Sequence, residues 1–118
     1  MLTIYHNPRC SKSRQTLALI EEKKHDVTIV EYLKTPLSIT KIEQLLLLLK
    51  LSPREMMRTK EAEFKEQNLT NADDATLIAA MANTPKLIER PIVTNNTRAI
   101  IGRPPENVLS LMQANNLK

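Results

Sequence analysis

With 118 residues, the chain is long enough for one domain with an ordinary hydrophobic core, and its net charge of +4 permits binding of an oxyanion without requiring it. Its single cysteine excludes an internal disulfide framework and points to a reducing compartment. One cysteine and two histidines are also too few ligands for a structural zinc site. Its single glycine excludes the glycine-rich loops that bind dinucleotides or nucleoside phosphates.

The first third of the chain predicts a strand, a helix and a second strand. Residues 2–6 alternate and are rich in β-formers, whereas residues 11–24 carry Leu17 and Ile20 at helical spacing and close with basic residues in the expected last turn. Residues 27–33 are β-branched and predict the second strand. Two strands joined by a helix favour a right-handed βαβ unit with parallel strands.

The middle of the chain predicts a helix that begins at Ser38, a candidate N-cap, and a short helix over residues 52–58 that ends near Arg58. The first of these helices has an apolar face formed by Ile39, Ile42, Leu46 and Leu49.

A further helix is expected over residues 71–83, with an Asx cap and acidic residues in its first turn. We interpret the pair Asp73 and Asp74 as a solvated helix start, which the helix dipole favours, rather than as an acid/base dyad. The residues expected to face inward are Leu77, Ile78 and Met81.

The last third predicts a hairpin and a closing helix. Residues 91–94 and 97–101 flank Asn95 and Asn96, and asparagine tolerates the left-handed backbone of a tight turn. The closing helix, over residues 103–113, has an inward face of Val108, Leu111 and Met112. This order of elements suits a thioredoxin-like α/β fold, with a four-stranded mixed sheet in one domain over residues 1–118 and a helical insertion at about 37–84.

Cys10 is expected at or just before the first turn of the first helix, where unpaired backbone N–H groups stabilise a thiolate and lower the pKa of the cysteine. Arg9, Lys12 and Arg14 add positive potential, and the same helix end attracts an anion. The alternative is that Cys10 is a small buried hydrophobic residue. The turn-forming and polar residues on both sides of it favour a reactive thiol.

Three arginines are candidates for the same site. Pro91 opens a strand, and in thioredoxin-like folds a cis-proline at this place faces the active-site cysteine, so Arg90 would point into the same pocket. Arg103 lies between a strand end and a helix start, stiffened by prolines, and Arg58 ends the short middle helix. Taken singly, each arginine is more often a surface residue than a ligand, and the functional interpretation depends on their convergence around Cys10.

Five stretches in this order and spacing resemble the ArsC family of glutaredoxin-dependent arsenate reductases, in particular its shorter chromosomal branch. They are YHNPRCSKSRQTL, EYLKTPLS, MMR, ERPIV and GRPPE, and the resemblance covers essentially the whole chain.

The resemblance implies a role for each matched residue. Cys10 would be the nucleophile, His6 a nearby polar group that favours its thiolate, and Ser13 a hydrogen-bond partner of the sulfur. The oxyanion-binding arginines would be Arg58, Arg90 and Arg103. Alternatively, His6 merely ends a strand and Ser13 is an ordinary first-turn serine.

The resemblance also implies arsenate or a similar oxyanion as substrate, glutathione as co-substrate and glutaredoxin as partner, with no bound cofactor and no metal. The thiolate would form a covalent adduct with arsenic, which glutathione and glutaredoxin resolve with release of arsenite.

Other functions remain open. One is a redox-responsive transcription regulator of the Spx type that binds RNA polymerase, although that branch typically carries Cys-x-x-Cys where Ser13 stands here. Another is a glutathione-dependent thiol oxidoreductase. A phosphate or nucleic-acid binder is disfavoured by the scarcity of aromatic residues.

The sequence predicts a cytoplasmic location. The N-terminus lacks a signal-peptide pattern, and the apolar run at 45–49 is too short to span a bilayer. Neither a membrane nor a nucleic acid is expected as a partner.

Overall fold

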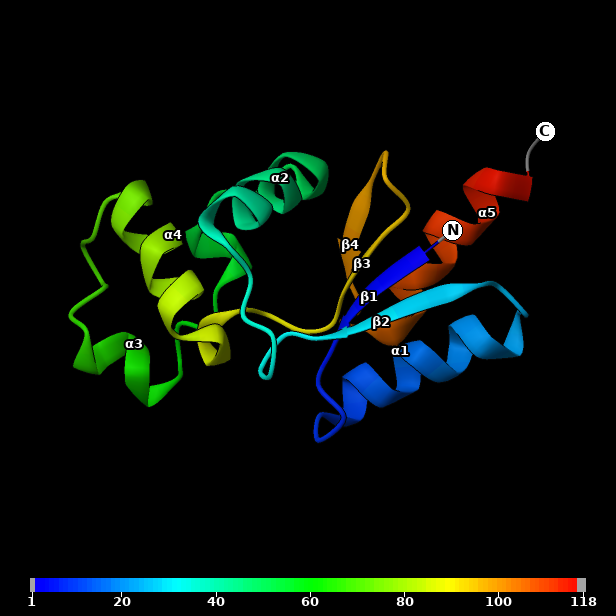
Figure 1. Ribbon diagram of the computed structural model, residues 1–118, viewed down its shortest axis with the longest axis horizontal. Helices are drawn as coiled ribbons and strands as arrows, with labels where there is room; N and C mark the ends of the chain where they lie inside the picture. Colours follow the sequence, from blue (N-terminus) through cyan, green and yellow to red (C-terminus); the bar gives the residue numbers. More distant parts are fainter. Residues whose placement is uncertain (1, 117–118) are drawn as a thin grey trace. The chain divides into compact units, whose positions relative to one another are not determined.

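The computed structural model describes residues 2–116, with side chains described up to Met112 (Figure 1). The chain divides into two units. Met1–Tyr32 and Arg90–Lys118 together form what we call the sheet unit, and Leu33–Glu89 forms the helical unit. That the whole chain is one domain with an insertion at about 37–84 stays a prediction.

The sheet unit contains four strands and the helices that pack on them. Its elements are β1 (Leu2–His6), α1 (Ser11–Glu22), β2 (Val27–Glu31), β3 (Ile92–Thr94), β4 (Ala99–Ile101), the 3₁₀ helix η3 (Pro105–Val108) and α5 (Leu109–Asn116). The strand order is β2-β1-β3-β4, with β1 and β2 parallel and the other pairs antiparallel. This confirms the predicted α/β class, the parallel βαβ unit and the four-stranded mixed sheet.

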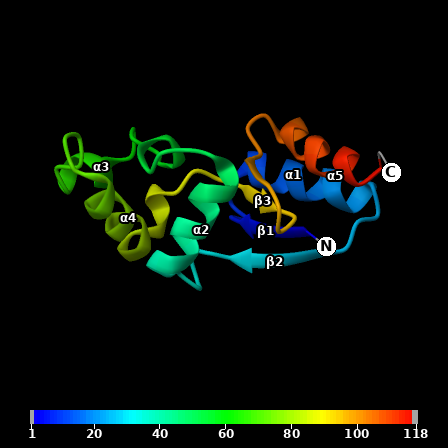
Figure 2. The ribbon, with the colours of Figure 1, turned by 90° about the horizontal axis from the view of Figure 1, so that it is seen from above.

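The core of the sheet unit lies between the sheet and its helices, because α1 and α5 cover the same face of the sheet (Figure 2). Strands and helices contribute alternating or helically spaced aliphatic side chains to it. Its buried members are Leu2, Ile4, Ile20, Val93, Val108, Leu111 and Met112. The predicted inward face of the closing helix is therefore confirmed.

The β3–β4 hairpin turns at the two asparagines, as predicted. Asn95 Oδ1 accepts hydrogen bonds from the backbone N–H groups of Thr97 and Arg98, at 3.1 and 2.9 Å. Asn96 adopts the left-handed conformation with φ of 81°. Asparagine thus closes the turn both through its side chain and through its tolerance of positive φ.

Several predicted boundaries in the sheet unit are wrong. Strand β4 begins at Ala99 rather than at residue 97, and the closing helix expected over residues 103–113 is the 3₁₀ helix η3 followed by α5 (Leu109–Asn116). Helix α1 ends at Glu22 rather than at residue 24, because Lys24 takes a left-handed conformation with φ of 60° that stops the helix. Consequently no basic residue lies in the last turn of α1. Strand β2 ends at Glu31, so Tyr32 and Leu33 lie beyond it.

The helical unit contains α2 (Ile39–Leu49), η1 (Arg54–Met56), α3 (Ala62–Glu66), α4 (Asp74–Asn83) and η2 (Pro85–Leu87). The predicted cap at Ser38 is confirmed, since Ser38 Oγ accepts from Lys41 N at 3.0 Å. Helix α4 begins at Asp74 rather than at residue 71, and its N-cap is Asp73, whose Oδ1 accepts from Thr76 N at 2.8 Å.

The face of α2 differs from the expected one, since the buried residues are Ile42, Leu45 and Leu46, while Ile39 is 48% exposed. In α4, Leu77 and Met81 are buried and Ile78 is half-buried.

Residues 52–58 form a single 3₁₀ turn that ends at Met56 rather than a helix ending near Arg58. Helix α3, which no pattern in the sequence predicts, is only 5 residues long and has one buried side chain, Phe64. None of the helices within residues 2–116 combines the length and hydropathy that crossing a membrane requires.

Candidate active site

Three neighbouring strands bring polar residues to one edge of the sheet. In the parallel pair His6 lies opposite Glu31, so Asn7 and Tyr32 are the next residues at the carboxyl ends of β1 and β2. In the antiparallel pair Tyr5 lies opposite Ile92, which places Arg90, two residues before Ile92, at the same edge. The strand order β2-β1-β3 therefore sets Tyr32, Asn7 and Arg90 in adjacent positions.

Cys10 joins this edge as the N-cap residue of α1, with extended backbone angles (φ −95°, ψ 123°). Its backbone N–H donates to Asn7 O at 3.0 Å, which closes the turn between β1 and the helix, and its carbonyl accepts from Arg14 N at 3.0 Å. The predicted position of Cys10 at the start of a helix is confirmed. Cys10 is only 9% exposed, which is more buried than its turn-forming neighbours indicate, but the groups that act on its sulfur are polar.

The pKa of Cys10 is lowered. Burial raises it, but hydrogen bonds to the sulfur from the backbone N–H of Ser13, from the Arg90 side chain and from the backbone N–H of Lys12, together with the charge of Arg90, outweigh that effect. The helix N-terminus and one arginine from a distant part of the chain thus favour a thiolate at this position.

Arg90 is fixed by the backbone around it. The Arg90–Pro91 peptide bond is cis, as expected for a thioredoxin-like fold. Pro91 O accepts a hydrogen bond from Gly102 N at 2.8 Å, which ties this loop to the end of β4. The Nε of Arg90 is buried and has no hydrogen-bond partner among the described residues. Arg90 therefore reaches the thiol while retaining an unused donor.

His6 and Ser13 form a buried pair below the thiol. His6 Nδ1 and Ser13 Oγ are 2.6 Å apart, and Ser13 Oγ also accepts from Asn7 N at 3.0 Å. With Asn7 N–H as donor to the hydroxyl, the Ser13 proton is directed to His6 Nδ1. Burial lowers the pKa of His6, helped by Arg14 and opposed by Glu31 and Glu21, so the neutral imidazole that accepts this proton is favoured.

This arrangement differs in detail from the expected one. Ser13 acts on the Cys10 sulfur through its backbone N–H, while its hydroxyl contacts His6 and Asn7. The two side chains hold the turn that presents Cys10. The roles of His6 and Ser13 in the chemistry stay predictions.

The other two arginines lie in different surroundings. Arg103 is exposed and belongs to the sheet unit, directly after β4, where its carbonyl accepts from Asn107 Nδ2 at 3.2 Å. Arg58 belongs to the helical unit, where its Nη1 lies 3.0 Å from Glu61 Oε2 and its Nε lies 3.9 Å from Glu89 Oε1. Their roles in oxyanion binding also stay predictions.

Sequence reasoning missed two members of this edge. Asn7 is one of the turn-forming residues before Cys10, yet it is 8% exposed and its Oδ1 accepts from Arg9 N at 3.0 Å. Tyr32 was placed inside the second strand, whereas it is the first residue beyond it. Ending that strand at Glu31, level with the end of the first strand, would have revealed both positions.

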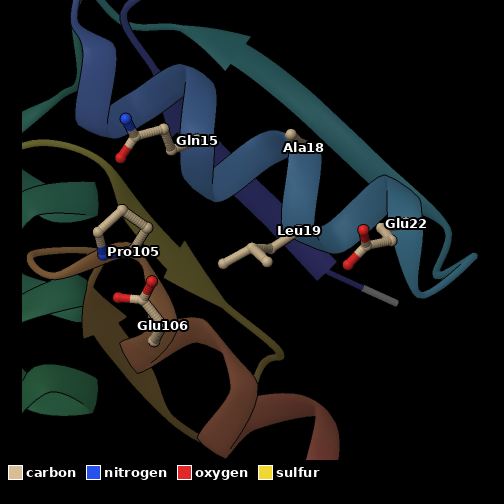
Figure 3. Close-up of a pocket in the computed structure, with 6 residues that line it drawn as sticks. All are labelled: Gln15, Ala18, Leu19, Glu22, Pro105 and Glu106. Carbon is tan, nitrogen blue, oxygen red and sulfur yellow. The ribbon is translucent and has the colours of Figure 1, made fainter.

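A separate groove of about 280 Å³ lies between α1 and η3 (Figure 3). Leu19 points toward Pro105 and Glu106 across it. Its lining residues are Gln15, Ala18, Leu19, Glu22, Pro105 and Glu106, and none of the predicted site residues is among them. Among the residues described, no cluster of His, Cys, Asp and Glu side chains suits a metal ion.

Comparisons with known proteins agree with this architecture. The protein YfgD of Escherichia coli K12 is 50% identical over 112 residues, covering 92% of this chain and 94% of that protein. An arsenate reductase of Haemophilus influenzae is 46% identical, covering 92% and 97%. The solved structure of an arsenate reductase from Vibrio cholerae matches with a TM-score of 0.90 and 50% identity, covering 92% of this chain and 95% of that one.

The fold is therefore thioredoxin-like, as predicted from the order of the elements. The family model described as "ArsC family" matches residues 5–111, which include Cys10 and the three candidate arginines. The chain belongs to the ArsC family.

Proposed function

We propose that this protein is an arsenate reductase in which the Cys10 thiolate attacks arsenate. The observation that carries the proposal is the lowered pKa of Cys10 at the start of α1, beside Arg90. Relatives named arsenate reductase at 46% identity, and a solved one at 50%, support arsenate as the substrate.

The first step needs both the thiolate and the arginines. Arsenate is an anion at neutral pH, so an approaching thiolate meets like-charge repulsion, which guanidinium groups reduce through forked hydrogen bonds to its oxygens. Arg90, Arg103 and Arg58 would supply these groups. The sulfur forms a bond to arsenic, the bond from arsenic to one hydroxyl group breaks, and that hydroxyl takes up a proton and leaves as water. Arsenic stays in the +5 state in this adduct.

The second step requires an external thiol, because the chain has a single cysteine and cannot resolve the adduct through an internal disulfide. A glutathione thiol adds to the adduct, and arsenic accepts the two electrons and leaves as arsenite. Cys10 is then held as a mixed disulfide with glutathione. A glutaredoxin thiol attacks the glutathione sulfur and returns Cys10 to the thiolate. No bound cofactor is needed in this scheme.

The test is a coupled assay of NADPH consumption with glutathione, glutathione reductase, glutaredoxin and arsenate. Cys10→Ser is expected to lower turnover by at least about 10³-fold, because the hydroxyl is not ionised near neutral pH. Arg90→Lys and Arg103→Lys should each lower kcat/KM by about 10- to 100-fold, since an ammonium cannot form the forked contact. Arg98→Lys, a change at an exposed arginine in the β3–β4 turn, serves as the control.

Two results would overturn this assignment. Full activity of both Arg90→Lys and Arg103→Lys would remove the arginines from their role. A wild-type protein that leaves arsenate untouched but reduces a glutathione mixed disulfide would be a glutathione-dependent thiol oxidoreductase.

A further inference from the structure

The Tyr32 hydroxyl has no evident structural purpose in the sheet unit. Tyr32 is the first residue beyond β2 and is 1% exposed. Its Oη is fully buried, and it has no hydrogen-bond partner among the described residues. Buried polar groups are almost always satisfied, so an unpaired hydroxyl at this depth calls for an acceptor that binds only at some stage of function.

The hydroxyl lies at the edge of the sheet that carries the thiol. The register of β1 and β2 places Tyr32 beside Asn7, and the register of β1 and β3 places Arg90 on the other side of Asn7. The backbone carbonyl of Asn7 accepts a hydrogen bond from the backbone N–H of Cys10. Arg90 and Cys10 both lie close enough to influence the ionisation of Tyr32.

Tyr32 stays neutral and keeps its proton near neutral pH. The pKa of Tyr32 is raised to about 12, because burial and the charge of Cys10 raise it and Arg90 and Asn7 only partly oppose them. A neutral phenol beside a cationic guanidinium can accept its N–H but cannot donate to it, because the guanidinium has no lone pair to offer, so the phenol proton is left for another acceptor.

Two unused donors therefore lie at one edge of the sheet. The Nε of Arg90 is buried without a partner among the described residues. The side chains of Arg90 and Asn7 donate toward the Tyr32 oxygen, but Arg90 has no acceptor to offer in return, so it cannot take up the phenol proton. The Oδ1 of Asn7 is already engaged by Arg9 N. A ligand with several acceptor oxygens, bound at Cys10, would satisfy both donors at once.

We propose that Tyr32 is a substrate-binding residue whose hydroxyl donates a hydrogen bond to an oxygen of the oxyanion bound at Cys10, beside the bond donated by Arg90. This inference rests on the proposed function, since it takes the ligand to be a tetrahedral oxyanion. The bond adds no charge to the site, so it strengthens binding of the oxyanion without changing the pairing of Arg90 with the thiolate.

The proposal separates oxyanion binding from activation of the thiol. Tyr32 is not among the groups that lower the pKa of Cys10, which are Arg90 and the backbone N–H groups of Ser13 and Lys12. Removing the Tyr32 hydroxyl should therefore weaken binding of the oxyanion and leave the pH dependence of Cys10 ionisation unchanged.

The experiment measures how arsenate and inorganic phosphate protect Cys10 from iodoacetamide, in Tyr32→Phe and in the wild type. Tyr5→Phe is the matched control, because Tyr5 is the other tyrosine of the chain, is also buried, and has its pKa raised by burial alone. Circular dichroism melts establish that each variant is folded. The alkylation rate without oxyanion, followed against pH, gives the midpoint of Cys10 ionisation.

We expect Tyr32→Phe to raise the oxyanion concentration needed for half protection by about tenfold, the usual size for one lost hydrogen bond to a charged group. Tyr5→Phe should match the wild type, and the ionisation midpoint should be the same in all three proteins.

Other outcomes overturn the proposal in distinguishable ways. Unchanged protection in Tyr32→Phe would remove its hydroxyl from the oxyanion site, and an increased ionisation midpoint would assign it to the thiolate instead. If no oxyanion protects the wild type, this inference and the proposed function both fail. If arsenate protects the wild type but is not reduced, the proposed function fails and the oxyanion role of Tyr32 stands.

Discussion

Arg90 in the sheet unit and Arg58 in the helical unit show two different uses of the same side chain. Arg90 acts on the Cys10 sulfur, and its Nε is buried and unpaired among the described residues. Arg58 instead lies within ion-pair distance of Glu61 and Glu89. The difference lies in the neighbouring charges.

The neighbours decide what each positive charge does. Around Arg58, the carboxylates neutralise the guanidinium, and Lys86 joins the same cluster at 3.7 Å from Glu61 and 3.4 Å from Glu63. Beside Cys10, the charge of Arg90 is available to a thiolate and to an incoming anion. A cation thus tunes a nucleophile in one setting and forms ion pairs with carboxylates in the other.

The largest expected effect distinguishes these two arginines. Arg90→Gln removes a charge and a hydrogen bond that lower the pKa of Cys10, so the thiolate should form only at higher pH. In the wild type, the midpoint of Cys10 alkylation against pH should lie below the value of about 8.5 for a free cysteine. In Arg90→Gln, this midpoint should increase. We expect kcat/KM for arsenate to fall by about 10²-fold.

Arg58→Gln is the matched change in the other unit. It should leave the alkylation midpoint where it is, because Arg58 is not among the groups that shift the pKa of Cys10. If Arg58 binds the oxyanion, kcat/KM should fall by about tenfold. An equal increase of the midpoint in both variants would contradict the contrast drawn between them.

An intermediate effect is expected from packing next to Arg90. A Cβ at Gly102 would lie 2.9 Å from Pro91 Cγ and 2.5 Å from Thr16 Oγ1, closer than side chains approach one another. Gly102→Ala should therefore push the Pro91 loop or α1 aside and lower the free energy of unfolding by about 1–3 kcal/mol, measured by urea denaturation. Thr16→Ala combined with Gly102→Ala removes both Thr16 contacts and leaves the clash with Pro91 in place, so a double variant as stable as Thr16→Ala alone would refute the role of the proline contact.

The smallest effect should come from the ion pairs of the helical unit. Glu61→Gln removes the carboxylate shared by Arg58 and Lys86, in a partly exposed position where solvent screens the charges. The loss of stability should stay within about 1 kcal/mol in thermal or urea unfolding. High salt should reduce the difference between wild type and variant, and a loss several times larger would show that this cluster holds the unit together.

Much of the fold was predictable because it depends on local patterns. Alternation and β-branching identified the strands, Ser38 identified one helix start, and the paired asparagines identified the hairpin turn. These signals act over a few residues, so the sequence alone contains them. The short helix α3 escaped because 5 residues with one buried side chain carry almost no periodic signal.

The sequence also determined that Cys10 would start a helix, since the turn residues before it and the helical pattern after it are neighbours along the chain. Only the tertiary structure decided which other groups reach that sulfur. Strand register aligned Tyr32, Asn7 and Arg90 at one edge, although more than fifty residues separate Tyr32 from Arg90. Pairing between distant strands, and the burial that leaves a hydroxyl unpaired, depend on long-range packing that no local pattern records.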